Sequence, residues 1–293
     1  MASFRQRSLA AHLFGTPPRE LPKKAARALR MATARACDLP DFLIVGAQKA
    51  GTSSLYHYLS QHPQVMPAYS KEVHYFDTQY RRGESWYRAS FPHRLERAMR
   101  EKILKSPTVT GEATPYYLYH PHAPQRIASD LPEAKLMVLL RNPTERALSH
   151  YHHTRRRALE SLSFEDALET EPERLGPELA RMREDPFYNS DPHRIFSYFD
   201  RGIYVDQLQR YAEHFPRRQM LVLQSEQLFR DPQAAINRVL EFLDLDPWSL
   251  PDATPVRMAG YSRERSEVHD RLDERFRAHN QRLFDFLDEE FDW

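Results

Sequence analysis

The chain has 293 residues, of which 41% are hydrophobic, and a formal net charge of +1. That length allows one large α/β domain or two small ones, with enough apolar residues for a sizeable core. The near-neutral charge excludes a general attraction to nucleic acid, and no apolar run is long enough to span a membrane. The single cysteine, Cys37, excludes an intrachain disulfide, so we expect a reducing compartment, the cytoplasm.

The first 38 residues form a basic segment ahead of a domain that spans residues 39–293. Residues 1–37 carry one acidic residue, Glu20, against eight basic ones: Arg5, Arg7, Arg19, Lys23, Lys24, Arg27, Arg30 and Arg35. The simplest interpretation is a solvated, partly disordered leader. The functional alternative is an arm that makes peripheral contact with an anionic membrane or another anionic partner.

From residue 39 onward, strand-like apolar runs alternate with helical patterns. The expected strands are Phe42–Gly46, Val73–Phe76, Val109–Gly111, Leu136–Leu140 and Met220–Leu223. The expected helices are Thr52–Gln61, Gln125–Asp130, Pro143–Leu159, Tyr204–His214, Gln233–Leu243 and Arg263–Glu290. Residues 155–200 are polar and interrupted by prolines, which favours a helical insertion. The alternation predicts a P-loop-like three-layer α/β fold, with a central parallel sheet flanked by helices.

The first expected strand runs into a short turn, Gly46–Ser54, that opens a helix. Its two glycines allow close backbone approaches, and the free N–H groups of a helix beginning near Thr52 point into the turn. Lys49 adds a mobile positive charge, and hydroxyls come from Thr52, Ser53 and Ser54. The turn therefore predicts a phosphate or sulfate site. It lacks the lysine directly after Gly51 that a Walker A loop uses to bind a triphosphate.

A second anion site is predicted where the strand Leu136–Leu140 ends. Arg141 follows this strand, at the edge where open α/β sheets bind ligands. A helix start is indicated by three residues: Asn142 as N-cap, Pro143 in the first turn and Glu145 at capping-box spacing. Ser149 lies two turns into this helix. An arginine and a serine so placed predict a grip on a second phosphate.

The segment "KEVHYFD", residues 71–77, is predicted to be a strand that carries the reacting groups. In a strand, Glu72 and His74 point to the same side and can together remove a proton from an alcohol, with Asp77 orienting His74. Two histidines of "HYHH", His150 and His153, share a helix face. No third ligand has a usable spacing, so no metal is expected.

Taken together, the turn with Lys49 ahead of "GTSSL" and the motif "LRNPTERALSHY" resemble the nucleotide-binding motifs of sulfotransferases. These enzymes use 3′-phosphoadenylyl sulfate (PAPS). Further matches are "KEVHYFD", "GEATPYYL" at 111–118, "YVDQLQRYAEHFP" at 204–216 and the closing "FDW". The chain looks most similar to the heparan sulfate 3-O-sulfotransferases and bacterial sulfotransferases.

The resemblance implies roles for particular residues. The first motif would hold the 5′-phosphosulfate through Lys49, Ala50, Gly51, Thr52, Ser53 and Ser54. The second would hold the 3′-phosphate through Arg141 and Ser149, and 3′,5′-ADP would be the product. It also implies that Glu72 is the base, with His74 as the alternative, that Lys49 neutralises the leaving group, and that no metal is required.

Two departures bear on the acceptor. This chain has Ala113 where the heparan-modifying members carry lysine, and their C-terminal nucleotide-covering segment is replaced by "RMAGY", with Arg257, Gly260 and Tyr261 as the expected contacts. We therefore expect a hydroxyl on a carbohydrate, lipid or small natural product. The alternatives are a P-loop kinase of a small alcohol and a non-catalytic protein with the PAPS-binding fold that only binds sulfated or phosphorylated partners.

Overall fold

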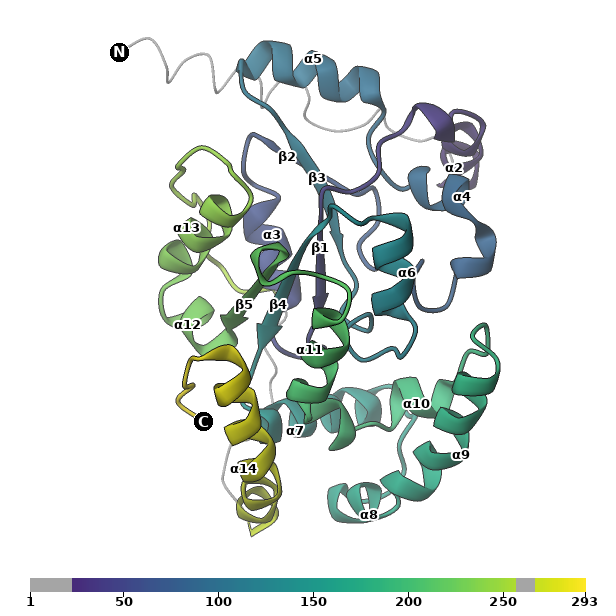
Figure 1. Ribbon diagram of the computed structural model, residues 1–293, viewed down its shortest axis with the longest axis vertical. Helices are drawn as coiled ribbons and strands as arrows, with labels where there is room; N and C mark the ends of the chain where they lie inside the picture. The colour runs from purple at the N-terminus through teal and green to yellow at the C-terminus, as the bar shows by residue number, and fades with distance from the viewer. Residues whose placement is uncertain (1–22, 257–266) are drawn as a thin grey trace.

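The computed structural model describes residues 23–256 and 267–293. Within these ranges, five parallel strands form one sheet in the order β2–β3–β1–β4–β5 (Figure 1). The strands are β1 (Phe42–Gly46), β2 (Val65–Pro67), β3 (Val109–Ala113), β4 (Lys135–Leu140) and β5 (Met220–Gln224). The predicted α/β fold with a central parallel sheet is confirmed.

Helices cover both faces of the sheet. Helices α3 and α13 contact each other on one face, and α6 and α11 contact each other on the other (Figure 1). The described helices are α2 (Lys23–Ala32), α3 (Thr52–Leu59), α4 (Glu84–Arg88), α5 (Arg94–Leu104), α6 (Ala123–Asp130), α7 (Pro143–Arg156), α8 (Phe164–Glu169), α9 (Glu171–Glu184), α10 (Asp191–Ile195), α11 (Tyr204–Ala212), α12 (Ser225–Arg230), α13 (Pro232–Phe242) and α14 (Glu267–Leu287).

The central strand β1 positions the candidate site. All five of its residues are buried, as expected for an apolar strand covered on both faces. It pairs with β3 on one side, Phe42 opposite Gly111, and with β4 on the other, Leu43 opposite Leu136. The order of the strands therefore reverses at β1, and ligands of open α/β sheets bind beyond the carboxyl end of such a strand.

Two local predictions were wrong. Residues 71–77 are not a strand, because Glu72 and His74 have φ of 59° and 58°, in the left-handed region. The edge strand β2 was not predicted, because it has only three residues and its last residue, Pro67, argues against a strand in the sequence. Proline is tolerated there because β2 lies at the edge of the sheet.

The basic segment has ordered contacts at its end. Ala34 and Cys37 are buried, the Arg30 Nε donates to the Ala89 carbonyl at 3.1 Å, and Arg88 donates to the Cys37 carbonyl at 3.0 Å. The boundary at residue 38 stays a prediction. Residues 155–200 contribute the end of α7 and helices α8 to α10.

Helix α14 contacts α7 and α11. The predicted nucleotide contacts Arg257, Gly260 and Tyr261 lie outside the described residues. Among the helices that the structure describes, none is both long and apolar enough to cross a membrane.

Candidate active site

The Gly46–Ser54 turn connects β1 to α3, as the sequence predicts. Gly51 caps α3 with φ of 96°, a left-handed conformation that side chains disfavour, and an added Cβ there would lie 2.9 Å from the ring of Phe229. At Gly46, a Cβ would lie 2.4 Å from the Cβ of Leu118. Both glycines are therefore required by close approaches, and the first N–H groups of α3 remain available to an anion.

The side chains of this turn point to different places. Lys49 and Thr52 line the cleft described below. Ala50 and Ser54 are buried, and the Ser54 hydroxyl accepts from the Val256 N–H at 2.9 Å. Ser53 accepts a hydrogen bond from the Lys71 ammonium at 2.7 Å. The structure thus brings Lys49 and Thr52 to the cleft, whereas the Ser54 hydroxyl holds a neighbouring segment.

Arg141 lies beside this turn, where its Nη1 donates to the Lys49 carbonyl at 3.4 Å. Its Nη2 forms an ion pair with Glu145 at 3.0 Å. Asn142 caps α7 as predicted, but Glu145 does not complete the capping box, because the Asn142 N–H donates to Glu226 at 3.0 Å. Ser149 is buried on α7, roughly 12 Å along the helix axis from Arg141. A shared phosphate for the two residues stays a prediction.

The loop Lys71–Asp77 brings together the three predicted reacting groups by a different geometry from a strand. The His74 Nε2 lies 3.7 Å from Glu72 Oε2, and the His74 Nδ1 lies 2.7 Å from Asp77 Oδ2. The Asp77 side chain is fully buried, so it holds the ring from behind. Lys71, which sequence reasoning missed, donates to Glu72 Oε1 at 3.0 Å.

These contacts determine the charges of Glu72 and His74. Interaction with the His74 ring lowers the pKa of Glu72 to about 2, against the opposing effect of burial and with help from Lys71. Burial disfavours a charged His74, but Asp77 and Glu72 together raise its pKa to about 10. At neutral pH the pair is a carboxylate and an imidazolium. Because an imidazolium has no free lone pair, only Glu72 can accept a proton in this state.

Side chains that follow in sequence hold the backbone of this loop. The N–H of Val73 donates to Glu112 Oε2 at 3.2 Å, and the N–H of Tyr75 donates to the Tyr117 hydroxyl at 2.8 Å. Between them, the N–H of His74 donates to Thr114 Oγ1 at 3.4 Å. Left-handed backbone at two non-glycine residues is costly and persists only when its surroundings enforce it. The hydrogen bonds from these three consecutive N–H groups provide that constraint.

Glu112 is the centre of this support. It is fully buried and also accepts from the hydroxyls of Thr114 at 2.5 Å, Tyr117 at 2.9 Å and Tyr87 at 3.0 Å. Burial raises the pKa of Glu112, against the effect of these hydrogen bonds. The motif "GEATPYYL" that contains it was recognised only as a family match, and its role depends on contacts across the fold.

One cleft of about 340 Å³ unites the two loops. Lys49, Thr52, Glu72 and His74 lie on its wall. Sequence reasoning singled out only the two histidines of α7 among the other lining residues, which are Gln48, Pro115, Tyr116, His150, His153, Thr154, Arg157, Leu159, Arg194 and Ile195. His150 is buried and neutral, because burial lowers its pKa well below the usual value. The end of α7 and α10 thus line the same cleft as Glu72.

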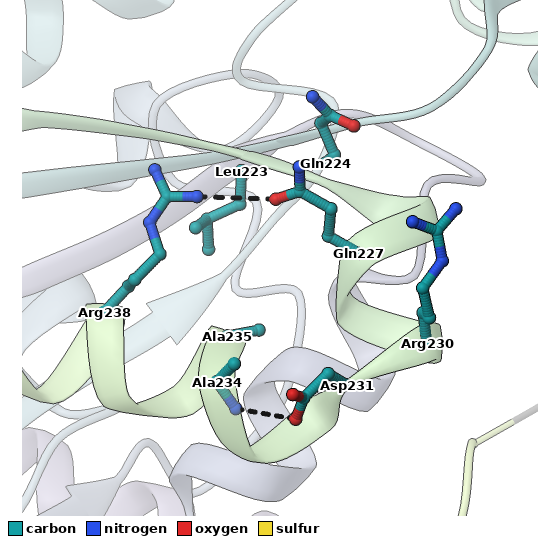
Figure 2. A pocket seen from close by; sticks show the side chains of 8 residues that line it. All are labelled: Leu223, Gln224, Gln227, Arg230, Asp231, Ala234, Ala235 and Arg238. Atoms are coloured by element: carbon teal, nitrogen blue, oxygen red, sulfur yellow. Dashed lines mark hydrogen bonds between the residues drawn. The ribbon is translucent and has the colours of Figure 1, made fainter. Parts of the chain in front are cut away.

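A smaller hollow of about 180 Å³ lies between β5, α12 and α13 (Figure 2). Its polar contacts are internal, since Arg238 donates to Gln227 at 3.5 Å and Asp231 caps α13 through the Ala234 N–H. It contains none of the predicted site residues. In residues 23–256 and 267–293, no group of three or more histidine, cysteine or acidic side chains is arranged to hold a metal ion.

The cleft can therefore support proton removal at one side and anion stabilisation at the other. Glu72 can accept a proton, with His74 and Asp77 fixing its position. Lys49 and the N–H groups of α3 can stabilise negative charge that develops on a bound anion.

Comparison with known proteins identifies the family. The sulfotransferase domain model matches residues 39–256. The membrane-associated sulfotransferase kil1 of Dictyostelium discoideum is 25% identical, over 87% of this chain and 66% of its own length. Heparan sulfate glucosamine 3-O-sulfotransferase 3B1 of Homo sapiens is 33% identical, over 71% of this chain and 46% of its own length.

A solved structure, that of a sulfotransferase from Alicyclobacillus acidocaldarius, is 30% identical with a TM-score of 0.64, and the match covers 87% of this chain and 98% of that chain. This chain spans only about half to two thirds of the length of the two curated relatives. The domain model nevertheless covers most of it, and the parallel sheet with both predicted motifs lies inside the matched region. The chain belongs to the PAPS-dependent sulfotransferase family.

Proposed function

We propose that this protein transfers the sulfuryl group of PAPS to an acceptor hydroxyl and releases 3′,5′-ADP. The observation that carries the proposal is the single cleft in which Lys49 and Thr52, at the start of α3, face the same space as Glu72 and His74. A donor with two separated anionic groups fits a chain with two anion-binding motifs. The acceptor is a carbohydrate, a lipid or a small natural product.

The reaction follows from the charges of the cleft. Glu72 accepts the proton of the acceptor hydroxyl while the oxygen attacks sulfur, and the bond between sulfur and the phosphate oxygen breaks. The released electron pair stays on that phosphate, where Lys49 and the N–H groups of α3 neutralise it. The acidity of the hydroxyl rises as its oxygen bonds to sulfur, which allows a carboxylate of low pKa to act as base.

The second motif is proposed to distinguish PAPS from other sulfate donors. Arg141, already beside the Lys49 carbonyl, and Ser149 would hold the 3′-phosphate. Arg257, Gly260 and Tyr261 are proposed to contact the nucleotide as well. We also propose a cytoplasmic location, although one relative of the chain is named a membrane-associated sulfotransferase.

Calorimetry with 3′,5′-ADP and 5′-AMP tests the donor site. A charge-assisted contact with the 3′-phosphate should make 3′,5′-ADP bind about ten- to a hundredfold more tightly. Equal affinities would contradict the assignment of Arg141 and Ser149. Stabilisation by ATP with Mg²⁺, but not by 3′,5′-ADP, would instead indicate a kinase.

Turnover is tested by transfer of label from radiolabelled PAPS to a panel of sugars, lipids and natural products. Labelled product that disappears in Glu72→Gln supports the proposal. Tight binding of 3′,5′-ADP without label transfer to any acceptor would indicate a binding protein.

A further inference from the structure

Exposed apolar side chains gather at one end of the molecule. Ten large hydrophobic residues are exposed in the described part of the chain, and six of them belong to α2, α5 and the loop after β2. Their exposed fractions range from 37% to 64%, and they are Leu29, Met31, Tyr69, Leu95, Met99 and Ile103. Scattered apolar residues are ordinary on protein surfaces, but a cluster of this kind indicates an interaction site.

Tyr69 connects the exposed residues of α2 to those of α5, although Leu29 and Met31 lie about 200° apart around α2 and so point to different sides of it. The Arg30 guanidinium lies over the Tyr69 ring, 4.4 Å from its centroid, and the Tyr69 hydroxyl donates to Glu96 Oε2 at 3.1 Å. Tyr69 therefore joins α2 to α5. On α5, three apolar residues recur at every fourth position, so they lie on one side of the helix. None of the α5 residues is buried, and we call this surface the α2–α5 face.

Exposed positive charge exceeds negative charge beside the α2–α5 face, where Glu96 is the one exposed acidic residue of α5. Arg35, Lys102 and Lys105 are exposed, and no ion pair within residues 23–256 and 267–293 engages them. The chain that precedes α2 has the same sign, because residues 1–22 hold three arginines against Glu20 alone. An apolar centre with a basic rim is the pattern of segments that lie in the interface of an anionic bilayer.

We propose that the α2–α5 face docks on an anionic membrane surface. Leu95, Met99 and Ile103 would enter the headgroup boundary, and the basic rim would attract anionic lipids. A second copy of the chain fits less well, because a two-fold contact would bring two basic rims together. Residues 1–22 fit less well as a cover, because they repel the rim for the same reason.

This docking would orient the cleft. Helices α2 and α5 lie at the end of the sheet opposite α7 and α10, whose residues line the cleft (Figure 1). A protein bound through the α2–α5 face would open its cleft away from the lipid. Its acceptor would then arrive from the aqueous side rather than from the same bilayer.

Vesicle sedimentation tests the face with the full-length protein. We expect wild type to pellet with vesicles of phosphatidylcholine and phosphatidylserine, and much less with phosphatidylcholine alone. The variant Leu95→Ser, Met99→Ser, Ile103→Ser should lower the partition coefficient at least tenfold. Lys102→Gln with Lys105→Gln should lower it roughly fivefold per charge, on anionic vesicles only. The matched control is Phe286→Ser on α14, which removes an exposed apolar side chain outside the face.

An unchanged unfolding temperature in each variant shows that a loss of pelleting reflects docking rather than misfolding. Equal pelleting of wild type and the triple serine variant would overturn the proposal, as would negligible pelleting of wild type on both vesicles. A dimeric wild type that becomes monomeric in the triple variant, without lipid binding, would assign the face to a second copy. Stronger vesicle binding after deletion of residues 1–22 would assign it to that segment. None of these outcomes depends on the sulfuryl transfer itself.

Discussion

The Gly46–Ser54 turn and the Lys71–Asp77 loop face the same cleft, but different parts of the chain determine their shapes. The turn has a recognisable local pattern, with a buried strand before it, α3 after it and a left-handed Gly51, although Lys49 is left-handed as well, with φ of 71°, and the two glycines pack against Leu118 and Phe229. The loop has two left-handed non-glycine residues, held by side chains about forty positions later in the sequence. Both loops thus depend on tertiary contacts, but only the donor turn also carries a local sequence pattern.

Removing the proposed base, Glu72, should have the largest effect and should separate the roles of the loop and the turn. Glu72→Gln keeps the size of the side chain but cannot accept a proton, so turnover should fall by roughly a hundredfold to ten-thousandfold. Affinity for 3′,5′-ADP should change little, because Glu72 is linked to the donor turn through Lys71, and the amide oxygen of glutamine can still accept from Lys71. Single-turnover kinetics and calorimetry measure the two quantities. Substantial activity in Glu72→Gln, together with its loss in His74→Asn, would make His74 the base.

The support of the loop is tested by Glu112→Gln. An amide cannot accept all four hydrogen bonds that this carboxylate receives, so stability should fall by about 1–3 kcal/mol. The displaced loop should also lower kcat by roughly ten- to a hundredfold. The KM for PAPS should change little, since the donor turn has its own support.

Glu171→Gln is the matched control for that experiment. Glu171 is also buried and accepts from three consecutive N–H groups, those of Tyr198, Phe199 and Asp200, at 3.0, 2.7 and 2.8 Å. The Glu171→Gln variant should lose stability to a similar degree but keep the kcat of wild type. An equal loss of kcat in both variants would mean that Glu112 acts only through overall stability.

The donor turn is tested by Gly51→Ala. The backbone of residue 51 has φ of 96°, which side chains disfavour, and the added Cβ would lie 2.9 Å from the ring of Phe229. Both the backbone conformation and the packing therefore oppose the substitution. Stability should fall by about 1–2 kcal/mol from the backbone effect alone, and nucleotide affinity should fall with it. Repeating Gly51→Ala in a Phe229→Ala background separates the two effects, because that background removes the ring and leaves the backbone conformation of residue 51 unchanged. Thermal unfolding with and without 3′,5′-ADP compares the two backgrounds, and an equal loss in both would show that the Phe229 contact is unimportant.

The smallest expected effect is the pH dependence of the loop. Because the folded pKa of His74 is raised from 6.5 to about 10, its stabilising effect is complete below pH 6.5 and is lost as the pH rises toward 10. The pKa of Glu72 is lowered to about 2, so its effect holds above pH 4.5 and is lost as the pH falls through 2. The Tm difference between wild type and His74→Asn should shrink from pH 6.5 to 10. A difference that is constant over this window would contradict the charged pair.

The sequence predicted those parts of the site whose signals are local. The apolar strands β1 and β4, the glycine turn and the cap at Asn142 each have a signal in neighbouring residues, and all four appear in the structure. The capping box failed because Glu145 has a competing partner in Arg141, while Glu226 takes the N–H that was assigned to it.

On the acceptor side, the sequence predicted which residues take part, Glu72, His74 and Asp77, but not the backbone conformation that holds them. Alternating side chains in "KEVHYFD" favour a strand, but none of the strands in residues 23–256 and 267–293 pairs with this segment, and its N–H groups instead donate to Glu112, Thr114 and Tyr117. Part of the lining of the cleft comes from the end of α7 and from α10, which are far apart in the sequence from Glu72. Tertiary contacts of this kind leave no local pattern.

Every strand pairing in the sheet joins distant parts of the chain, which has a consequence for how the protein folds during synthesis. Phe42 pairs with Gly111, and Leu136 pairs with Met220. Closing such long loops costs entropy before any contact is gained, so folding of parallel sheets is slow. On the ribosome, β1 emerges first and must wait for β3 and β4 as an unpaired apolar segment. The same two strands bring Glu112 to the Lys71–Asp77 loop and Arg141 to the Gly46–Ser54 turn, so both halves of the site are completed by the assembly of the sheet.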